Sequence, residues 1–137
     1  MNNYLKQKEI YDKKYNKELQ KSGIFYAFSN EQFKNNKIPS NAPDNEFLSW
    51  FGGSYIHKDN KSKLVDFFDV KVKELQKEFK DNIKIEDYIK YELSNHECYY
   101  TSDYLSIDYL VIELYPELSI QEVHKKIKEV FYNKEVV

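Results

Sequence analysis

The chain has 137 residues and a formal net charge of −2, and all 21 of its basic side chains are lysines. This length suits one domain with a core of its own, a single cysteine cannot form an internal disulfide, and no apolar run approaches the roughly 20 residues that cross a bilayer. With no such run and no disulfide, we expect a cytoplasmic protein with no membrane partner. Arginine supplies the bidentate fork that reads guanine edges, so its absence argues against base-specific DNA recognition and arginine-dependent phosphoryl transfer.

The first predicted element is an amphipathic, lysine-rich helix within residues 1–22, with its regular part over about residues 3–21. Its apolar residues recur at spacings of seven, four and four, which is typical of a surface helix packed along one face. The pair Ser22 and Gly23 supplies a C-terminal stop. The residues of the apolar face are Tyr4, Tyr11, Tyr15 and Leu19.

Residues 23–58 are predicted to form the strands. The segment "GIFYAFS" is short, aromatic and bounded by turn residues, which favours a buried strand. Ser29 opens the capping box "SNEQ" and a brief helix that ends near Asn36. After a loop rich in proline and asparagine, "FLSWF" and "SYIH" flank Gly52 and Gly53, and we predict a hairpin because two glycines allow the positive φ angles of a tight turn.

Residues 59–137 are predicted to be helical throughout. A long central helix begins at "KDN", and three shorter helices follow it. The second of these three is capped by Thr101 or Ser102 and ended by Pro116, and the third follows the S-x-x-E capping box at Ser119. The apolar residues expected to face the core are Leu64, Phe68, Val72, Leu75 and Phe79 in the central helix, Ile85, Ile89 and Leu93 in the next, Tyr104, Ile107, Val111 and Leu114 in the third, and Ile120, Val123, Ile127, Val130 and Phe131 in the last.

These elements predict an α+β fold. A small three-stranded antiparallel sheet, formed by the strand before Ser29 and the hairpin, packs with four longer helices, and the C-terminal half is all helical. No internal repeat or linker divides the sequence, so we expect one domain over residues 1–137.

The charges are distributed unevenly along the chain. Residues 1–80 carry 15 lysines against 11 acids and residues 81–137 carry 6 lysines against 12 acids, which gives net charges of +4 and −6. Within residues 86–122 a single lysine, Lys90, accompanies nine acids. Because such polarisation concerns partners more than folding, we expect the acidic half to bind a basic partner. The nine acids are Glu86, Asp87, Glu92, Glu97, Asp103, Asp108, Glu113, Glu117 and Glu122.

The stretch "SNHECYY", residues 94–100, has one structural interpretation and two chemical ones. As the connection between two helices it places Asn95 in a left-handed C-cap, with His96 hydrogen-bonding the last carbonyls of the finished helix. A metal site in this region lacks any repeated ligand spacing such as C-x-x-C or H-E-x-x-H. Nucleophilic catalysis by Cys98 needs a partner such as His96 or His57, and the neighbouring tyrosines indicate a packed cysteine instead. The candidate metal ligands are His96, Glu97, Cys98, Asp103 and His124.

Three segments, "GIFYAFSNEQF", "FGGSYIHKDN" and "YELSNHECYYTSD", occur in this order, and with them the sequence resembles a family of short proteins from phages and bacterial mobile elements. The resemblance covers about residues 23–132, and its most specific part is a signature of the form E-L-x-N-H-E-x-Y-Y-T-x-D. The glycine usual before the final aspartate is Ser102 here, and Trp50, Phe51 and the lysine-rich first helix also depart from the pattern. The resemblance implies an architecture and a bacterial, phage-related setting, and no activity. The matching signature residues are Asn95, His96, Glu97, Tyr99, Tyr100, Thr101 and Asp103.

That setting favours a non-enzymatic protein that acts by binding. In size and acidity the chain resembles phage proteins that inhibit nucleic-acid-targeting defence systems, which implies an anti-CRISPR-type inhibitor. The implied partner is a CRISPR effector, an RNA-guided nuclease, with an RNA-targeting type VI effector as the specific candidate. Carboxylates can occupy a basic channel that is built for phosphates, and exposed tyrosines add anchoring area. We expect no cofactor, no metal and no small-molecule substrate. The expected partner-binding residues are Glu86, Asp87, Glu92, His96, Glu97, Tyr99, Tyr100, Asp103 and Asp108.

The lysines of the first helix form a second candidate surface. Because lysine contacts phosphate without reading bases, these side chains are expected to touch the guide RNA of the effector. Two alternatives from other classes stay open: a metal-dependent hydrolase that uses His96, Glu97 and Asp103, and a nonspecific nucleic-acid-binding accessory protein led by the first helix. The lysines expected to contact nucleic acid are Lys6, Lys13, Lys14, Lys17 and Lys21.

Overall fold

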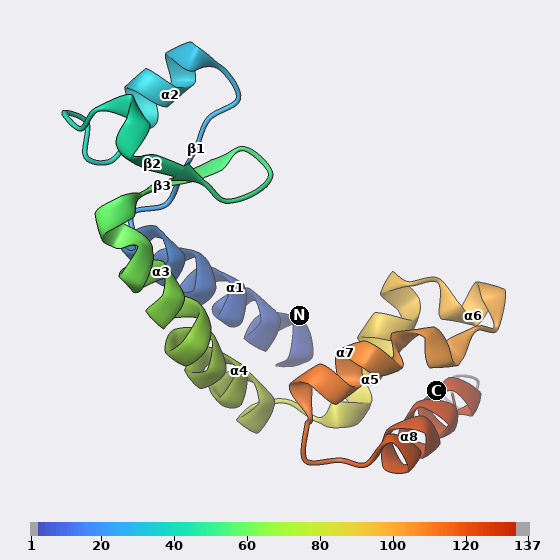
Figure 1. Cartoon of the computed structure of the whole chain (residues 1–137). Helices are drawn as coiled ribbons and strands as arrows, with labels where there is room; N and C mark the ends of the chain where they lie inside the picture. The colour runs from blue at the N-terminus through green and yellow to red at the C-terminus, as the bar shows by residue number, and fades with distance from the viewer. Residues whose placement is uncertain (1–2, 134–137) are drawn as a thin grey trace. The chain divides into compact units, whose positions relative to one another are not determined.

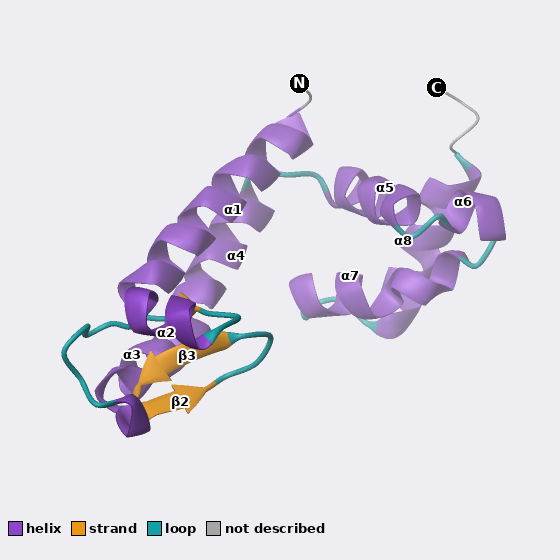
Figure 2. Ribbon diagram, turned by 90° about the horizontal axis from the view of Figure 1, so that it is seen from above, coloured by secondary structure: helices purple, strands orange, loops and turns teal. Residues whose placement is uncertain are grey.

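The computed structural model describes residues 3–133 and has the α+β fold that the sequence predicts (Figure 1). Helices predominate, and the strands form one three-stranded antiparallel sheet (Figure 2). The described residues divide into two compact units: unit 1 comprises residues 3–8 and 78–133, and unit 2 comprises residues 9–77. The expectation of one domain over residues 1–137 stays a prediction.

Unit 2 contains the whole sheet. The sheet has the strand order β1-β3-β2, so β3 is antiparallel to both of its neighbours. The first helix covers the residues that its apolar spacing predicts. The elements are α1 (Asn3–Lys21), whose first residues belong to unit 1, β1 (Phe25–Tyr26), α2 (Asn30–Asn36), β2 (Phe47–Ser49), β3 (Ser54–His57), α3 (Lys61–Asp66) and α4 (Val72–Asp81), whose last residues belong to unit 1.

The predicted hairpin is confirmed. Strands β2 and β3 pair with Leu48 opposite Ile56, and the loop between them holds Gly52 at a φ of 59° and Gly53 at a φ of 80°. These left-handed angles are the ones that glycine adopts without steric cost. The strand predicted in "GIFYAFS" is regular over only two residues, Phe25 and Tyr26. The N–H of Ala27 continues their register with β3 and donates to the carbonyl of Gly53 at 2.9 Å.

An aromatic cluster holds these short strands together. The ring of Phe25 lies 5.6 Å from that of Phe33 on α2 and 5.5 Å from that of Phe47 on β2, centroid to centroid. The cap of α2 fixes this placement, because Ser29 Oγ accepts a hydrogen bond from the N–H of Gln32 at 3.1 Å, as the capping box predicts. Aromatic pairs at such distances contribute more to stability than their buried area alone would give. They therefore pack α2 firmly against the sheet.

The central helix departs from its predicted spacing in one turn. A π-helical segment, Phe67–Lys71, joins α3 to α4, whereas the predicted apolar face assumed α-helical spacing throughout. A π-turn takes in more residues than an α-turn, so two consecutive aromatic side chains can both pack. Phe67 is buried 5.1 Å from the ring of Tyr15, and Phe68 is half-buried and stacks 6.0 Å from Trp50. The more deeply buried residue is thus Phe67, where the prediction had Phe68.

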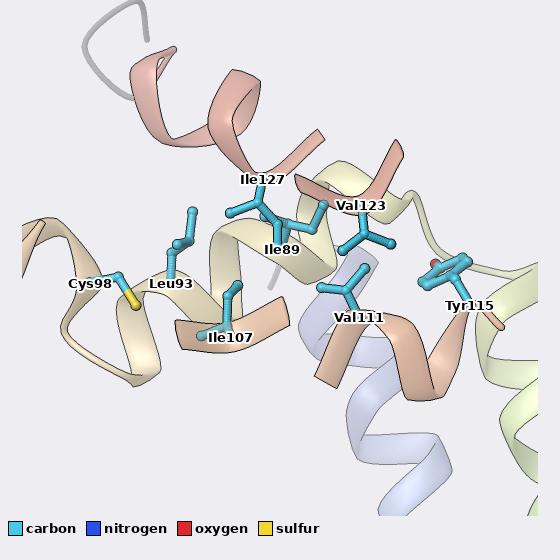
Figure 3. Packing of buried hydrophobic residues seen from close by; sticks show 8 residues of the cluster. All are labelled: Ile89, Leu93, Cys98, Ile107, Val111, Tyr115, Val123 and Ile127. Atoms are coloured by element: carbon cyan, nitrogen blue, oxygen red, sulfur yellow. The ribbon is translucent and has the colours of Figure 1, made fainter. Parts of the chain in front are cut away.

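Unit 1 is helical and encloses one apolar core, to which every helix after α4 contributes (Figure 3). The predicted faces of these helices are confirmed at their centres, where the side chains are fully buried and point toward one another. The prediction is wrong for Ile120, which is 49% exposed at the start of the last helix. The elements are α5 (Ile85–Asn95), α6 (Cys98–Thr101), α7 (Asp108–Leu114) and α8 (Ile120–Tyr132), with a 3-10 turn over Tyr104–Ile107 before α7. The buried residues are Ile89, Leu93, Cys98, Ile107, Val111, Tyr115, Val123 and Ile127.

Tyr4, near the start of α1, extends the packing of unit 1. Its ring lies 5.8 Å from that of Phe79, 6.3 Å from that of Tyr88 and 5.2 Å from that of Tyr91. Burial raises the pKa values of Tyr4 and Tyr88 well above the usual range, and the nearby Glu92 carboxylate raises both further. These phenols are therefore neutral far into the alkaline range.

The ends of α7 and α8 follow the predicted signals. Helix α7 ends at Leu114, two residues before Pro116, which cannot continue it. Helix α8 begins at the predicted capping box, where Ser119 Oγ accepts from the N–H of Glu122 at 3.1 Å and donates to the carboxylate of the same residue at 3.1 Å. Across residues 3–133, none of the helices has both the length and the apolar character that crossing a membrane requires.

Candidate interaction surface

Residues 94–103 fold differently from the predicted connection between two helices. Helix α5 includes Asn95, and the residue with the left-handed conformation is Glu97 at a φ of 57°, so the prediction of an Asn95 C-cap is wrong. The chain then forms the single turn α6 from Cys98 to Thr101. Burial explains why the left-handed residue comes two positions later than predicted. The turn at Glu97 places the fully buried Cys98 side chain in the core of unit 1.

His96 does not use its side chain to satisfy the end of α5, which corrects a second expectation. The backbone N–H of His96 donates to the carbonyl of Glu92 at 3.0 Å, and the N–H of Glu97 donates to the carbonyl of Ser94 at 3.1 Å. The last turn of the helix is therefore closed by backbone groups. The imidazole instead lies 3.3 Å from the Glu92 carboxylate, Nε2 to Oε2, and forms an ion pair there when it is protonated.

A second left-handed residue, Ser102 at a φ of 65°, ends α6. Its N–H donates to the carbonyl of Cys98 at 2.8 Å. The hydroxyl of Thr101 accepts from the N–H of Asp103 at 3.3 Å, and the next turn, Tyr104–Ile107, has no side-chain cap, so the prediction that Thr101 or Ser102 caps a helix is wrong. Ser102 occupies the place where the resembled signature usually has glycine, the residue that such a φ favours.

Replacing Ser102 with glycine is expected to raise the free energy of unfolding by about 1 kcal/mol. The left-handed conformation costs a non-glycine residue about 1–2 kcal/mol, and the greater freedom of glycine in the unfolded chain cancels part of the gain. Urea unfolding followed by circular dichroism measures the difference. The matched control is S94G, the same substitution inside the last turns of α5, which is expected to lower stability by a similar amount. Destabilisation by both substitutions contradicts the assignment of strain to Ser102.

Helix α6 presents its two tyrosines in different ways. Tyr100 is 92% exposed, whereas Tyr99 is half-buried and stacks on Phe131 at 5.4 Å with an interplanar angle of 8°. Burial raises the pKa of Tyr99. Together with Ser94 and Glu97, the two tyrosines line a pocket of about 440 Å³. Of the two predicted partner-binding tyrosines, Tyr100 thus offers a whole ring to a partner, and Tyr99 forms a fixed wall of the pocket.

The carboxylates predicted to bind a partner fall into two groups. One group has a basic neighbour within unit 1: Glu86 lies 3.8 Å from the ammonium of Lys126, and Asp108 lies 2.9 Å from Nε2 of His124. Glu92, half-buried beside His96, belongs to this group. The second group has exposed side chains that can face a partner directly. Its members are Asp87, Glu97 and Asp103.

The candidate metal ligands are not assembled into a site. Among residues 3–133, no three or more histidine, cysteine, aspartate or glutamate side chains come together in a group that could hold a metal ion. His96, Glu97 and Asp103, the residues of the hydrolase alternative, do not form such a group within this range. Cys98 is packed, as the neighbouring tyrosines predict: its side chain is fully buried, with Sγ 3.5 Å from the hydroxyl of Ser106.

The lysines that were expected to contact nucleic acid are all exposed along α1. At about 100° per residue they fall within an arc of roughly 100°, on the side of the helix away from the tyrosines. Lys13 lies 2.9 Å from the Glu9 carboxylate and Lys21 lies 3.0 Å from that of Glu18. These pairs reduce the positive charge that the helix offers, and nucleic-acid contact by this face stays a prediction.

Three exposed aromatic residues at or beside the hairpin turn have no counterpart among the predicted site residues. Phe28 is 77% exposed, Phe51 is 74% exposed and Trp50 is 46% exposed. Phe28 covers the hairpin turn closely, because a Cβ built on Gly53 would lie 2.5 Å from the Phe28 ring. The exposure could have been predicted from the position of Trp50 and Phe51 next to a two-glycine turn, where side chains rarely reach a core.

One family model matches most of the chain. No curated protein and no solved structure matches it. The model of the family described as a family of unknown function, DUF7659, matches residues 6–131 and so includes every strand and all but the ends of α1 and α8. That description gives neither an activity nor a source, so the phage-related setting stays a prediction. With all but a few terminal residues matched, the chain belongs to the family of unknown function DUF7659.

Proposed function

We propose that this protein is a non-enzymatic inhibitor, and that it binds the basic nucleic-acid channel of an RNA-guided nuclease effector through the surface around α6. The observation that carries the proposal is the presentation of Tyr100. Its ring is 92% exposed on a single helical turn that two left-handed residues, Glu97 and Ser102, hold in place. A large exposed aromatic side chain on a fixed turn is the kind of group that anchors protein interfaces.

The charge of unit 1 supports a basic partner. The segments of the sequence that make up this unit, residues 1–8 and 78–137, carry 9 lysines against 13 acids. Exposed carboxylates at Glu97 and Asp103 flank α6 within two residues on either side in the sequence, and that of Asp87 lies further away, in the first turn of α5. A cluster of carboxylates can take the place of phosphates in a positively charged channel, and complementary potentials also accelerate association.

The packing of α6 lowers the entropy cost of binding. Tyr99 is stacked on Phe131, and Cys98 is fully buried, so the turn that bears Tyr100 is fixed before a partner arrives. Ordering a mobile side chain at an interface costs about 0.5–1.5 kcal/mol, and tyrosine has few rotatable bonds for the area that it covers. The pocket beside Tyr100, with Ser94 and Glu97 in its wall, can accept a lysine or arginine side chain of the partner.

The class of partner follows from the resemblance described above, and the sharper proposal is an RNA-targeting type VI effector. In such a complex the lysines of α1 are proposed to contact the guide RNA as a secondary, sequence-independent attachment. Because the main interface is electrostatic, its affinity is expected to fall as the salt concentration rises.

A pull-down and a cleavage assay test the proposal together. Tagged protein is incubated with a purified type VI effector and its guide RNA, eluted with a salt gradient, and added in increasing amounts to target-RNA cleavage reactions. We expect co-elution at low salt and loss of cleavage. A protein that neither co-elutes with the effector nor changes its cleavage rate refutes the proposal for this class of partner.

Two charge-reversed variants of equal net charge locate the surface. The variant E97K/D103K changes two exposed carboxylates that flank α6, and the control E31K/D69K changes two exposed carboxylates of unit 2. We expect the first to weaken effector binding at least tenfold and the second to leave it within about twofold, because rim charges act locally at physiological salt. Equal losses in both variants would show that net charge, and not the α6 surface, governs binding. Y100A, which removes a side chain that is 92% exposed, should also weaken binding without lowering stability.

A further inference from the structure

A polar pocket in unit 2 lies between the end of α1 and the helix formed by α3 and the π-helical segment. Its volume is about 360 Å³. Three lysines, Lys21, Lys63 and Lys71, line it together with two acids, Glu18 and Asp66. Ser22, Ser62 and Phe67 complete the lining. The pocket lies entirely within residues 9–77 and shares no residue with the α6 surface.

The π-helical segment explains how Lys63 and Lys71 come to line the same pocket. In a regular α-helix two turns contain about seven residues, so a residue eight positions further along is displaced by roughly 80° around the axis. The π-turn over Phe67–Lys71 takes in about one residue more than an α-turn. Two turns then contain about eight residues, which brings Lys71 back to the face of Lys63. π-Turns of this kind are frequent at functional sites.

The carboxylate of Glu18 already pairs with one of the lysines of this pocket. It accepts a hydrogen bond from the ammonium of Lys21 at 3.0 Å. This bond lowers the pKa of Glu18, and the positive charges of Lys21, Lys71 and Lys17 lower it further. An ammonium has three N–H donors, so the lysines keep donors for a further anion after pairing with carboxylates.

We propose that this pocket binds the phosphate of a nucleotide-sized ligand, with Lys21, Lys63 and Lys71 as the donors. Lysine binds phosphate as a compact point charge, and in a chain without arginine it is the only side chain that carries a permanent positive charge. The volume falls within the range of small-ligand pockets and leaves room for a sugar or base beside the phosphate. Glu18 is one internal competitor, because it holds the Lys21 ammonium when no ligand is present. Glu74, whose carboxylate lies 3.8 Å from the Lys71 ammonium, is another.

Isothermal titration calorimetry on the whole protein at low salt tests the proposal, with adenosine triphosphate, inorganic phosphate and a short single-stranded RNA as the probes. The lining variants K63Q and K71Q are compared with K61Q and K73Q, which remove exposed lysines two positions away that do not line the pocket. We expect each lining variant to weaken binding at least about fivefold, because charge-assisted hydrogen bonds to phosphate are lost, and each control to change it less than twofold.

A third variant, E18Q, separates binding from general damage to the fold. Removing the carboxylate that pairs with Lys21 should strengthen phosphate binding by about threefold or more, whereas a disturbed pocket would weaken it. Binding of the triphosphate alone with this pattern identifies a free nucleotide as the ligand, and binding of the RNA with the same pattern identifies a nucleic-acid strand. Failure of all three probes to bind, or equal losses in lining and control variants, overturns the proposal. None of these outcomes depends on the α6 surface, so they are distinguishable from a failure of effector binding.

Discussion

Replacing Leu93 with alanine is expected to lower the free energy of unfolding by about 3–4 kcal/mol, within the range measured for fully buried leucines. Leu93 lies on α5 with no exposed surface and belongs to the buried cluster of unit 1. The truncation removes apolar contacts with the surrounding helices and leaves a cavity that a close-packed core cannot fill. Chemical unfolding in urea, followed by circular dichroism, measures the loss.

The matched control for Leu93 is Leu105, a leucine of the same unit that is 38% exposed. L105A deletes the same atoms from a position that water already reaches, so its expected cost is below about 1 kcal/mol. The difference between the two variants measures the burial of α5 in the core. A cost of L93A as small as that of L105A would contradict the packing shown in Figure 3.

The stability of the protein is expected to fall above pH 10 in a way that depends on Tyr115. Burial raises the pKa of Tyr115 to about 12, and the carboxylates of Glu117 and Glu86 add to the effect. The unfolded chain releases this proton near pH 10, so the stabilisation is fully present below pH 10 and is lost as the pH rises toward 12. A shift of this size corresponds to about 3 kcal/mol. Tyr4 and Tyr88 act in the same direction because their pKa values are also raised.

The variant Y115F isolates this contribution. The Tyr115 hydroxyl is buried and has no hydrogen-bond partner among the described residues, so its removal should raise stability at neutral pH by about 1 kcal/mol. The ring itself stays in place beneath the Lys80 ammonium, which lies 5.2 Å from its centroid. Because phenylalanine cannot ionise, the advantage of the variant should widen between pH 7 and about pH 11.5. Urea unfolding at these two values measures it.

Y100F serves as the control for the alkaline experiment, because the Tyr100 side chain is 92% exposed. Removing its hydroxyl should leave stability unchanged at neutral pH and leave the alkaline loss as in the original protein. An advantage of Y115F that stays constant with pH would mean that Tyr115 is not buried in the folded state.

The parts of the fold that depend on neighbouring residues could be predicted from the sequence. The caps at Ser29 and Ser119, the hairpin at Gly52 and Gly53, and the end of α7 before Pro116 are confirmed, because each depends on groups within about four residues. The α+β class follows from the same elements. Local signals were weaker for β1, whose two regular residues are set by pairing with a strand far along the chain.

The predictions that were wrong concern positions whose backbone conformation is decided by core packing. Asn95 is a better left-handed residue than Glu97 by local preference, yet the chain turns at Glu97 because Cys98 has to reach the core. The π-turn could not be predicted either. It allows two aromatic contacts, Phe67 with Tyr15 and Phe68 with Trp50, and both depend on residues far away in the sequence. Tertiary packing overrides local propensity at such positions.

In the candidate site, too, composition could be read from the sequence, whereas side-chain orientation could not. The acidity of the region around α6 was visible in the sequence, and so was its content of tyrosine. The orientation of these side chains was not: Tyr99 packs against Phe131, whereas its neighbour Tyr100 is almost fully exposed. Likewise, the meeting of Lys63 and Lys71 with Lys21 depends on the π-turn, which periodicity alone does not reveal.

The contacts of Tyr4 have a consequence for the order in which the chain can fold during synthesis. Tyr4 packs on Phe79, Tyr88 and Tyr91, so its partners leave the ribosome long after it does. A nascent chain that ends at residue 77 already contains the whole of unit 2, while unit 1 still lacks nearly all of its core. Contacts between residues so distant in sequence form slowly, so the first turn of α1 can pack only after these partners have been synthesised. The first turn of α1 is thus expected to be among the last of the described segments to pack.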